Sequence, residues 1–133
     1  MIIISTTSFP LKKDDHAGHF VLSQALGLSH SSEPVTIVAP AHPESNDSYL
    51  PDHVAVHRFK WPGWQSRINL AHGNGILENI RSSPRLARQL PFFVIAMSKT
   101  MKTLARNPEI SGIISNWLLP AGLVCPIQSR EAA

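Results

Sequence analysis

The chain has 133 residues, of which 43% are hydrophobic and 16% charged, with a formal net charge of +3. This length corresponds to one domain, and the apolar content excludes a disordered chain. The single cysteine, Cys125, excludes an internal disulfide, and no stretch approaches the roughly 20 apolar residues that span a bilayer. The apolar run at residues 2–4 is too short for a signal peptide and follows no basic residue. We therefore expect a cytoplasmic protein.

The first part of the sequence predicts a βαβ unit. Residues 1–5 and 35–39 are short, continuous apolar runs, typical of strands that are buried on both faces. Between them, from about residue 18 to residue 29, apolar side chains recur at helical spacing. Because a helical crossover joins the two strands, we expect them to pair in parallel.

The second part of the sequence adds two strands and further helices. Residues 54–59 predict a third strand after a loop at 41–52 that is rich in Pro, Ser, Asn and Asp. Helical stretches follow around residues 76–81 and 91–106, and residues 110–115 predict a fourth strand. This order predicts an α/β domain in which helices flank an open, parallel, Rossmann-like sheet.

The end of the sequence does not complete such a sheet. Pro120 falls in the first turn of a helix expected after the fourth strand, but Pro126 follows only six residues later, where it would remove a helical hydrogen bond. Residues 128–133 have no apolar stripe that could pack on a sheet. We therefore expect residues 1–133 to form a single, incomplete domain with an uncovered strand edge.

The loop at residues 9–20, after the first strand, is a candidate ligand site. It lies at the sheet edge where open α/β sheets bind ligands, and it leads into a helix N-terminus, which attracts phosphate. Ala17 and Gly18 are small enough for a ligand to approach the backbone closely. No Gly-x-Gly-x-x-Gly dinucleotide fingerprint is present. The alternative interpretation is an ordinary helix start with Asp15 as its N-cap.

Two histidines of this loop, His16 and His19, are three residues apart and could share one face of a helix. A metal ion would need further ligands, and no cluster of Cys, Asp or Glu supplies them, so we expect no metal site. A single histidine that contacts a phosphate or a hydroxyl group fits the sequence better.

Charge is distributed unevenly along the chain. Residues 1–57 contain two basic and six acidic residues, whereas residues 58–106 contain nine basic residues and one acidic residue.

On a helical wheel, six basic residues of the second segment fall within about 100°. These six are Arg81, Arg85, Arg88, Lys99, Lys102 and Arg106. Phe92 and Ile95 project on the same side, which suits an anionic membrane surface. A solvated basic face without a partner is the equal alternative, and Pro91 divides the wheel if it starts a new helix.

The exit of the fourth strand is a further candidate site, because it reaches the same edge of the sheet. Asn116 could form a hydrogen bond with a sugar hydroxyl group. Trp117 could stack on a sugar ring or fill the core.

Four stretches in order carry a family resemblance. They are Asp-His-Ala-Gly-His-Phe at 15–20, Val-His-Arg-Phe at 56–59, Leu-Ala-His-Gly-Asn-Gly-Ile-Leu-Glu-Asn-Ile-Arg at 70–81, and Asn-Trp-Leu-Leu-Pro-Ala-Gly-Leu at 116–123. Together they resemble the N-terminal domain of family 4 glycosyltransferases, which have the two-domain GT-B architecture. The resemblance extends to about Val124.

The resemblance implies the acceptor-side domain of an enzyme that transfers a sugar from a nucleotide-sugar, its co-substrate, without an essential metal or other cofactor. The acceptor would be a polysaccharide, a lipopolysaccharide or a glycolipid. Ala17, Gly18 and His19 would form the loop that approaches the phosphates of the donor. The acceptor side would include Asp15, His16, Asn116 and Trp117. Because many members bind membranes peripherally, the resemblance also favours the inner face of a membrane, and no nucleic-acid motif is present.

Two departures from the family pattern limit this expectation. Asn116 stands where the family commonly has a histidine before the tryptophan, and an amide cannot carry a proton near neutral pH. No catalytic residue is assigned beyond Asn116. The C-terminal domain that binds the donor is absent from the sequence, so we expect no transferase activity from this chain alone, unless that domain is supplied in cis or in trans. A non-catalytic sugar- or nucleotide-binding module and a membrane-surface protein are the alternatives.

Overall fold

The computed structural model describes residues 1–29, 33–66, 70–72 and 75–116. Its elements, in chain order, are β1 (Ile2–Ser5), α1 (His19–Ser29), β2 (Val35–Pro40), β3 (Val54–Phe59), α2 (Ile76–Ser82), the 3-10 helix η1 (Pro84–Gln89), α3 (Leu90–Ala105) and β4 (Gly112–Ser115). The four strands and the helix after the first strand lie within two residues of their predicted positions. The helix expected around Pro120 lies outside the described residues.

The four strands form one parallel sheet in the order β3-β2-β1-β4. The backbone of β1 pairs with both β2 and β4, so that Ile3 lies opposite Thr36 on one side and Ile113 on the other. All six residues of β2 are buried, because β2 lies inside the sheet and is covered on both faces. This explains its continuous apolar sequence. The predicted open α/β sheet is therefore confirmed.

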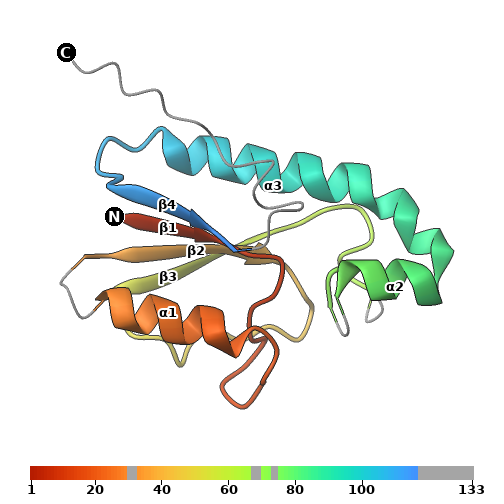
Figure 1. Cartoon of the computed structure of the whole chain (residues 1–133), viewed down its shortest axis with the longest axis horizontal. Helices are drawn as coiled ribbons and strands as arrows, with labels where there is room; N and C mark the ends of the chain where they lie inside the picture. The colour runs from red at the N-terminus through yellow and green to blue at the C-terminus, as the bar shows by residue number, and fades with distance from the viewer. Residues whose placement is uncertain (30–32, 67–69, 73–74, 117–133) are drawn as a thin grey trace.

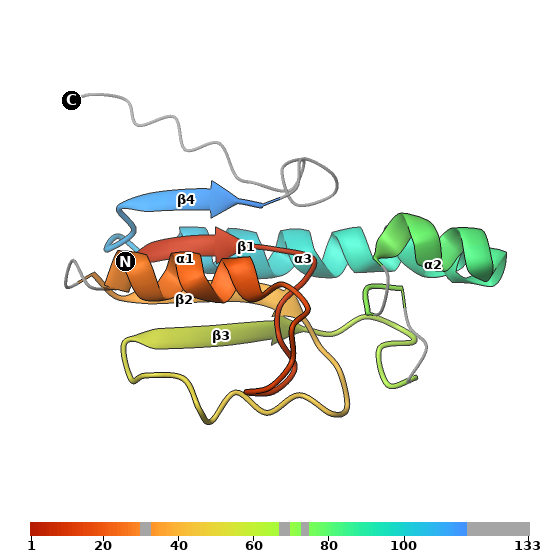
Figure 2. The ribbon, with the colours of Figure 1, turned by 60° about the horizontal axis from the view of Figure 1, so that its bottom comes forward.

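Helices cover both faces of this sheet (Figures 1 and 2). Alternate side chains of β1 enter two separate cores, because successive residues of a strand point to opposite faces. Ile3 packs in the core that contains Phe93 and Met97 of α3. Ile4 packs in the core that contains Val21 of α1. The result is a three-layer arrangement with α1 and α3 on opposite sides of the sheet.

This arrangement creates a topological switch point between β1 and β4. The chain passes from β1 through α1 to β2 on one side of β1, and later returns through α3 to β4 on the other side. The two crossover helices, α1 and α3, therefore lie on opposite faces of the sheet on either side of this point. In open α/β sheets, the crevice at such a point is the usual ligand site.

The basic segment forms three helical pieces rather than one. Arg81 lies in α2, Arg85 and Arg88 lie in η1, and α3 begins only at Leu90. The prediction of one continuous helical face over residues 81–106 is therefore wrong. The division expected at Pro91 is confirmed, because this proline lies in the first turn of a new helix, α3. None of the described helices is long and apolar enough to cross a membrane.

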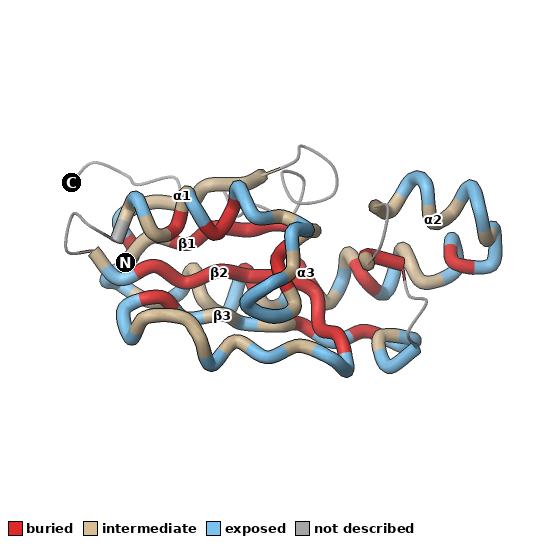
Figure 3. Tube along the Cα trace, turned by 90° about the horizontal axis from the view of Figure 1, so that it is seen from below, coloured by how far each residue is buried: buried red, intermediate tan, exposed pale blue. Residues whose placement is uncertain are grey.

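The distribution of burial shows which helices stabilise the fold. Buried residues concentrate in β1 and β2 (Figure 3), and those of α1 and α3 belong to the two cores on the faces of the sheet. Phe93, Met97 and Met101 of α3 are fully buried. In contrast, α2 has no buried residue and projects beyond the carboxyl edge of the sheet (Figure 1).

Candidate functional site at the carboxyl edge of the sheet

The carboxyl ends of β1 and β4 meet at the switch point. The Ser5 hydroxyl at the end of β1 donates to the Ser115 hydroxyl of β4 over 3.0 Å. The backbone N–H of Asn116 donates to the carbonyl of Ser5 over 2.9 Å. Because parallel strands end at a common edge, these contacts place the end of β1 beside the exit of β4.

The loop between β1 and α1 is folded back on itself. The hydroxyl of Thr6 donates to the carbonyl of Ser8 over 2.8 Å. Gly18, immediately before α1, has a φ of +66°, and a Cβ atom built there would lie 2.4 Å from the Ser8 carbonyl oxygen. Glycine is therefore required here by the loop's own backbone.

Asp15 stabilises this loop from inside, and its alternative assignment as the N-cap of the helix is wrong. Its carboxylate accepts hydrogen bonds from the backbone N–H groups of Leu11 over 2.9 Å and Ala17 over 3.1 Å, while α1 begins only at His19. Burial by itself raises the pKa of Asp15, but these two hydrogen bonds and the nearby Lys12 outweigh it, so the pKa lies below its ordinary value. The carboxylate is therefore ionised at neutral pH.

The histidines of the loop do not share a helical face as the sequence suggested. His16 precedes α1, and its carbonyl accepts the backbone N–H of His19, the first residue of the helix, over 3.3 Å. The Nδ1 atom of His19 lies 3.5 Å from the hydroxyl oxygen of Ser23, one turn along α1. Ala17, His16 and His19 are all exposed at the surface of this loop.

Asn116 joins the exit of β4 to α1. Its side-chain amide donates to the side-chain oxygen of Gln24 over 3.0 Å, and both residues are half-buried. This contact fixes one end of the Asn116 amide at the switch point. Trp117, predicted as its companion on the acceptor side, lies outside the described residues.

The sequence interpretation missed Arg58, which holds two loops of this edge together. From β3, its guanidinium donates to the carboxylate of Asp47 over 2.9 and 2.7 Å, to the carbonyl of Pro40 over 3.1 Å and to the carbonyl of Pro10 over 2.8 Å. The same group lies 5.6 Å from the ring centre of Phe9. The loop after β1 and the loop after β2 are therefore tied to one side chain, of which 8% is exposed.

A pair of packed histidines, His42 buried and His72 half-buried, was also missed. The rings of His42, after β2, and His72, in the segment before α2, meet edge to face at 4.6 Å between centroids. The Nε2 atom of His72 lies 3.2 Å from the carbonyl oxygen of Ala41, which can only accept, so Nε2 carries the proton. Burial, followed by the effect of His42, lowers the pKa of His72 to about 4. His72 is therefore neutral at physiological pH.

Tyr49 contributes a buried group without a partner at the same edge. Among the described residues, its hydroxyl oxygen is buried and has no hydrogen-bond partner. Burial, reinforced by Asp47, raises the pKa of Tyr49 above its ordinary value. Burying such a hydroxyl group destabilises the folded chain, because the group loses its hydrogen bonds to water and gains none within the protein.

The predicted membrane- or anion-binding residues lie on, or at the end of, the helices that connect β3 to β4. All six of them are exposed: Arg81, Arg85, Arg88, Lys99, Lys102 and Arg106. Within the described ranges, only Arg81 among them forms an ion pair, with Glu78 at 3.7 Å. The six residues come from α2, η1 and α3 or its end, and none of them forms a hydrogen bond or ion pair with Ser5, Ser115 or Asn116 among the described residues.

Comparisons with known proteins identify no family for this chain. No protein-family model matches it, and neither a curated protein nor a solved structure is significantly similar to it. Within the described part of the chain, no three His, Cys, Asp or Glu residues are close enough together to hold a metal ion. The geometry of the carboxyl edge is therefore the basis for any functional assignment.

Proposed function

We propose that this chain is the acceptor-side domain of a glycosyltransferase of the GT-B architecture, related to family 4. The observation that supports this most strongly is the position of Asn116 at the switch point between β1 and β4, where it contacts Ser5 at the end of β1 and Gln24 of α1. Ligands of open α/β sheets bind in that crevice. In the proposed enzyme, a second Rossmann-like domain, in cis or in trans, binds the nucleotide-sugar and completes the active site.

The chemistry proposed for this domain is positioning rather than proton transfer. The start of α1 offers the positive end of a helix dipole to the donor's phosphates, while the backbone N–H groups of Ala17 and His19 donate within the loop itself. Asn116 can orient a sugar hydroxyl group, but its amide cannot act as a general base. The domain would therefore hold the donor phosphates and the acceptor in the correct relative position. The residues that promote cleavage of the bond between the sugar and the nucleotide would belong to the partner domain.

A non-catalytic module that binds a sugar or nucleotide is the second candidate. The feature that favours it is the Asn116–Gln24 hydrogen bond, which occupies the amide of Asn116 within the domain itself. Both candidates place the ligand at the same crevice. They differ in whether sugar transfer appears once a donor-binding domain is present.

Ligand titration tests the site that both candidates share. The ¹⁵N-labelled chain is titrated with uridine diphosphate, guanosine diphosphate and a panel of methyl glycosides. We expect shifts in the amide signals of Ala17, Gly18, His19 and Asn116, with millimolar affinity. An Asn116→Ala variant should weaken glycoside binding. The matched control is Asn107→Ala, because Asn107 lies in the turn before β4, at the opposite end of that strand. Shifts confined to other regions, or none at all, would refute the proposed site.

Transfer assays then separate the two candidates. Radiolabelled nucleotide-sugars are incubated with the chain and a membrane extract that contains lipid and polysaccharide acceptors. The enzyme hypothesis predicts no transfer by the chain alone and transfer when a donor-binding domain is added. Transfer by the purified chain alone would show that the donor site is not confined to a second domain. Crevice binding without transfer under either condition would favour the binding module.

A further inference from the structure

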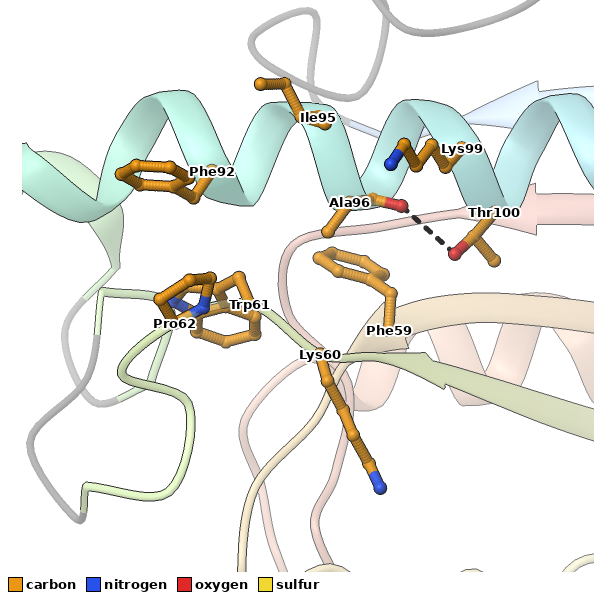
Figure 4. A pocket seen from close by; sticks show the side chains of 9 residues that line it. All are labelled: Phe59, Lys60, Trp61, Pro62, Phe92, Ile95, Ala96, Lys99 and Thr100. Carbon is orange, nitrogen blue, oxygen red and sulfur yellow. Dashed lines mark hydrogen bonds between the residues drawn. The ribbon is translucent and has the colours of Figure 1, made fainter.

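The structure has a groove of about 350 Å³ between the exit of β3 and α3. Phe59, Trp61 and Pro62 line it from the β3 side, and Phe92 and Ala96 line it from α3 (Figure 4). This volume falls within the range of about 300–1,000 Å³ that is typical of small-molecule sites. Two strands separate β3 from β4 in the sheet, which puts the groove about 14 Å or more from the exit of β4 at the usual strand spacing.

Packed aromatic rings preform the floor of the groove. The buried ring of Phe93 meets the rings of Phe59 and Trp61 nearly edge to face, at 5.0 and 4.8 Å between centroids. The indole N–H of Trp61 donates to the side-chain oxygen of Gln89 over 2.9 Å, which ties the turn after β3 to the residue before α3. Gly63 in this turn packs so closely on Gln89 that an added Cβ atom would lie 2.5 Å from its amide nitrogen. A ligand therefore meets a groove that needs little ordering, which favours its affinity.

The mouth of the groove is apolar and open to solvent. Phe92 is 53% exposed, although a side chain of this size is usually buried. Pro62, on the opposite wall, is exposed as well. Because aromatic rings attract one another beyond the burial of their surface, the rings of Phe92, Trp61 and Phe59 favour an aromatic guest over an aliphatic one.

One positive charge borders this apolar surface. Lys99 lines the groove from α3 and has no ion pair within the described ranges. Lys60 also lines the groove, but its side chain turns away from α3 (Figure 4), and its Nζ atom lies 4.9 Å from the ring centre of Trp64. No lining residue is acidic, and Glu78, the one acidic residue between residues 58 and 106, pairs with Arg81. The negative charge that complements Lys99 therefore has to come from the ligand.

We propose that this groove binds a small, soluble aromatic monoanion, such as an aryl carboxylate. Its ring system lies between Phe92 and Pro62, above the indole of Trp61, and its carboxylate pairs with the ammonium group of Lys99. The groove has room for one or two fused rings but not for a helix, whose diameter is about 10 Å, and a single cation matches a single carboxylate. This site goes beyond the proposed sugar transfer and does not depend on it.

NMR titration of the full chain tests the proposal with defined probes. The chain is ¹³C-labelled at the methyl groups of alanine and threonine and titrated with indole-3-acetate, its neutral analogue indole-3-acetamide, and acetate. We expect indole-3-acetate to shift the methyl signals of Ala96 and Thr100, with a dissociation constant of about 0.2–2 mM. Indole-3-acetamide should bind about fivefold more weakly because it lacks the charge, and acetate should cause no shift because it lacks the ring.

Two pairs of matched variants locate the ligand. Lys99→Gln should weaken the binding of indole-3-acetate about fivefold and leave that of indole-3-acetamide unchanged. Its control is Lys102→Gln, which makes the same charge change at an exposed residue of α3 that does not line the groove. Phe92→Ala should weaken the binding of both indoles about tenfold. Its control is Phe20→Ala, because Phe20 is 52% exposed but belongs to α1. Circular dichroism confirms that each variant is folded.

Three results would overturn the proposal. One is the absence of shifts in the methyl signals of the groove, and another is equal affinity for the two indoles, because Lys99 would then contribute nothing. The third is an equal loss of affinity in Lys99→Gln and Lys102→Gln, because binding would then follow net charge alone. None of these results concerns the crevice beside Asn116, which is tested with nucleotides and glycosides, so this proposal and the sugar-transfer proposal can fail separately.

Discussion

Asp47 holds the guanidinium of Arg58 with two hydrogen bonds of 2.9 and 2.7 Å, and the Arg58 side chain is only 8% exposed. This pair links β3 to the loop after β2, and Arg58 reaches on to the carbonyl of Pro10 in the loop after β1. The two loops that border the carboxyl edge therefore depend on one ion pair for their relative position.

Removing the acidic partner should destabilise the fold. In Asp47→Ala, Arg58 keeps its two carbonyl acceptors but loses its counter-charge in a site that excludes most water. We expect the free energy of unfolding to fall by about 2–3 kcal/mol, measured by urea denaturation. The control is Glu78→Ala, which breaks the exposed pair with Arg81 at 3.7 Å and should have almost no effect. Similar losses in both variants would show that the Arg58 site is not effectively buried.

The sequence gives a usable signal for Arg58, although its partners could not be predicted. In β3, Val54 and Val56 point towards the core that contains α1, and Arg58 continues the same alternation. A charged residue at a position where the pattern requires an apolar one indicates a buried partner. Asp47 lies eleven residues earlier, in a loop with several acidic and polar residues, and only the folded loop shows which of them is the partner.

Local sequence patterns predicted the fold well because they reflect burial directly. The continuous apolar run of β2 follows from its cover on both faces, and the α3 stripe ending in Met101 follows from packing on one face. The roles of Asp15 and His72 could not be predicted in this way. Asp15 acts through a loop reversal, and His72 meets His42 thirty residues away. Both contacts depend on tertiary structure that has no periodic signature.

The two glycines that flank and occupy α1 should respond in opposite directions to the same substitution. Gly18→Ala adds a Cβ atom that would lie 2.4 Å from the Ser8 carbonyl oxygen, at a φ of +66°. We expect it to lower the free energy of unfolding by about 2 kcal/mol or more. Gly27→Ala meets nothing within 4 Å inside the helix and should raise it by up to about 1 kcal/mol. Thermal unfolding of both variants measures the contrast, and a stable Gly18→Ala variant would contradict the observed loop conformation.

The hydroxyl group of Tyr49 should be dispensable for stability. It is buried without a hydrogen-bond partner among the described residues. Folding therefore removes its hydrogen bonds to water and provides no replacement. We expect Tyr49→Phe to raise the free energy of unfolding by about 1 kcal/mol. Tyr49→Ala, which also removes the ring packed against the core on the α1 side, should lower it. If Tyr49→Phe is clearly destabilising, the hydroxyl group must have a partner.

Stability should depend on pH through His72. Its pKa in the folded chain is about 4, compared with an ordinary value of 6.5. Above pH 6.5, this side chain is neutral in both the folded and the unfolded chain. As the pH falls from 6.5 towards 4, His72 becomes protonated in the unfolded chain but stays neutral in the folded chain. The free energy of unfolding therefore decreases over this window by up to about 3 kcal/mol. The low pKa of Asp15 adds a further loss only below about pH 4, as its carboxylate is protonated.

Urea denaturation at pH 7.5, 6 and 5 tests this dependence with a variant and a control. His72→Gln keeps an N–H donor for the Ala41 carbonyl but cannot be protonated, so the loss of stability on acidification should be much smaller. His57→Gln changes an exposed histidine of β3 and should retain the full pH dependence. Because His42 packs against His72, protonation of either ring places a positive charge in a site with little room for water. If His72→Gln retained the full pH dependence, the histidine pair would not be its source.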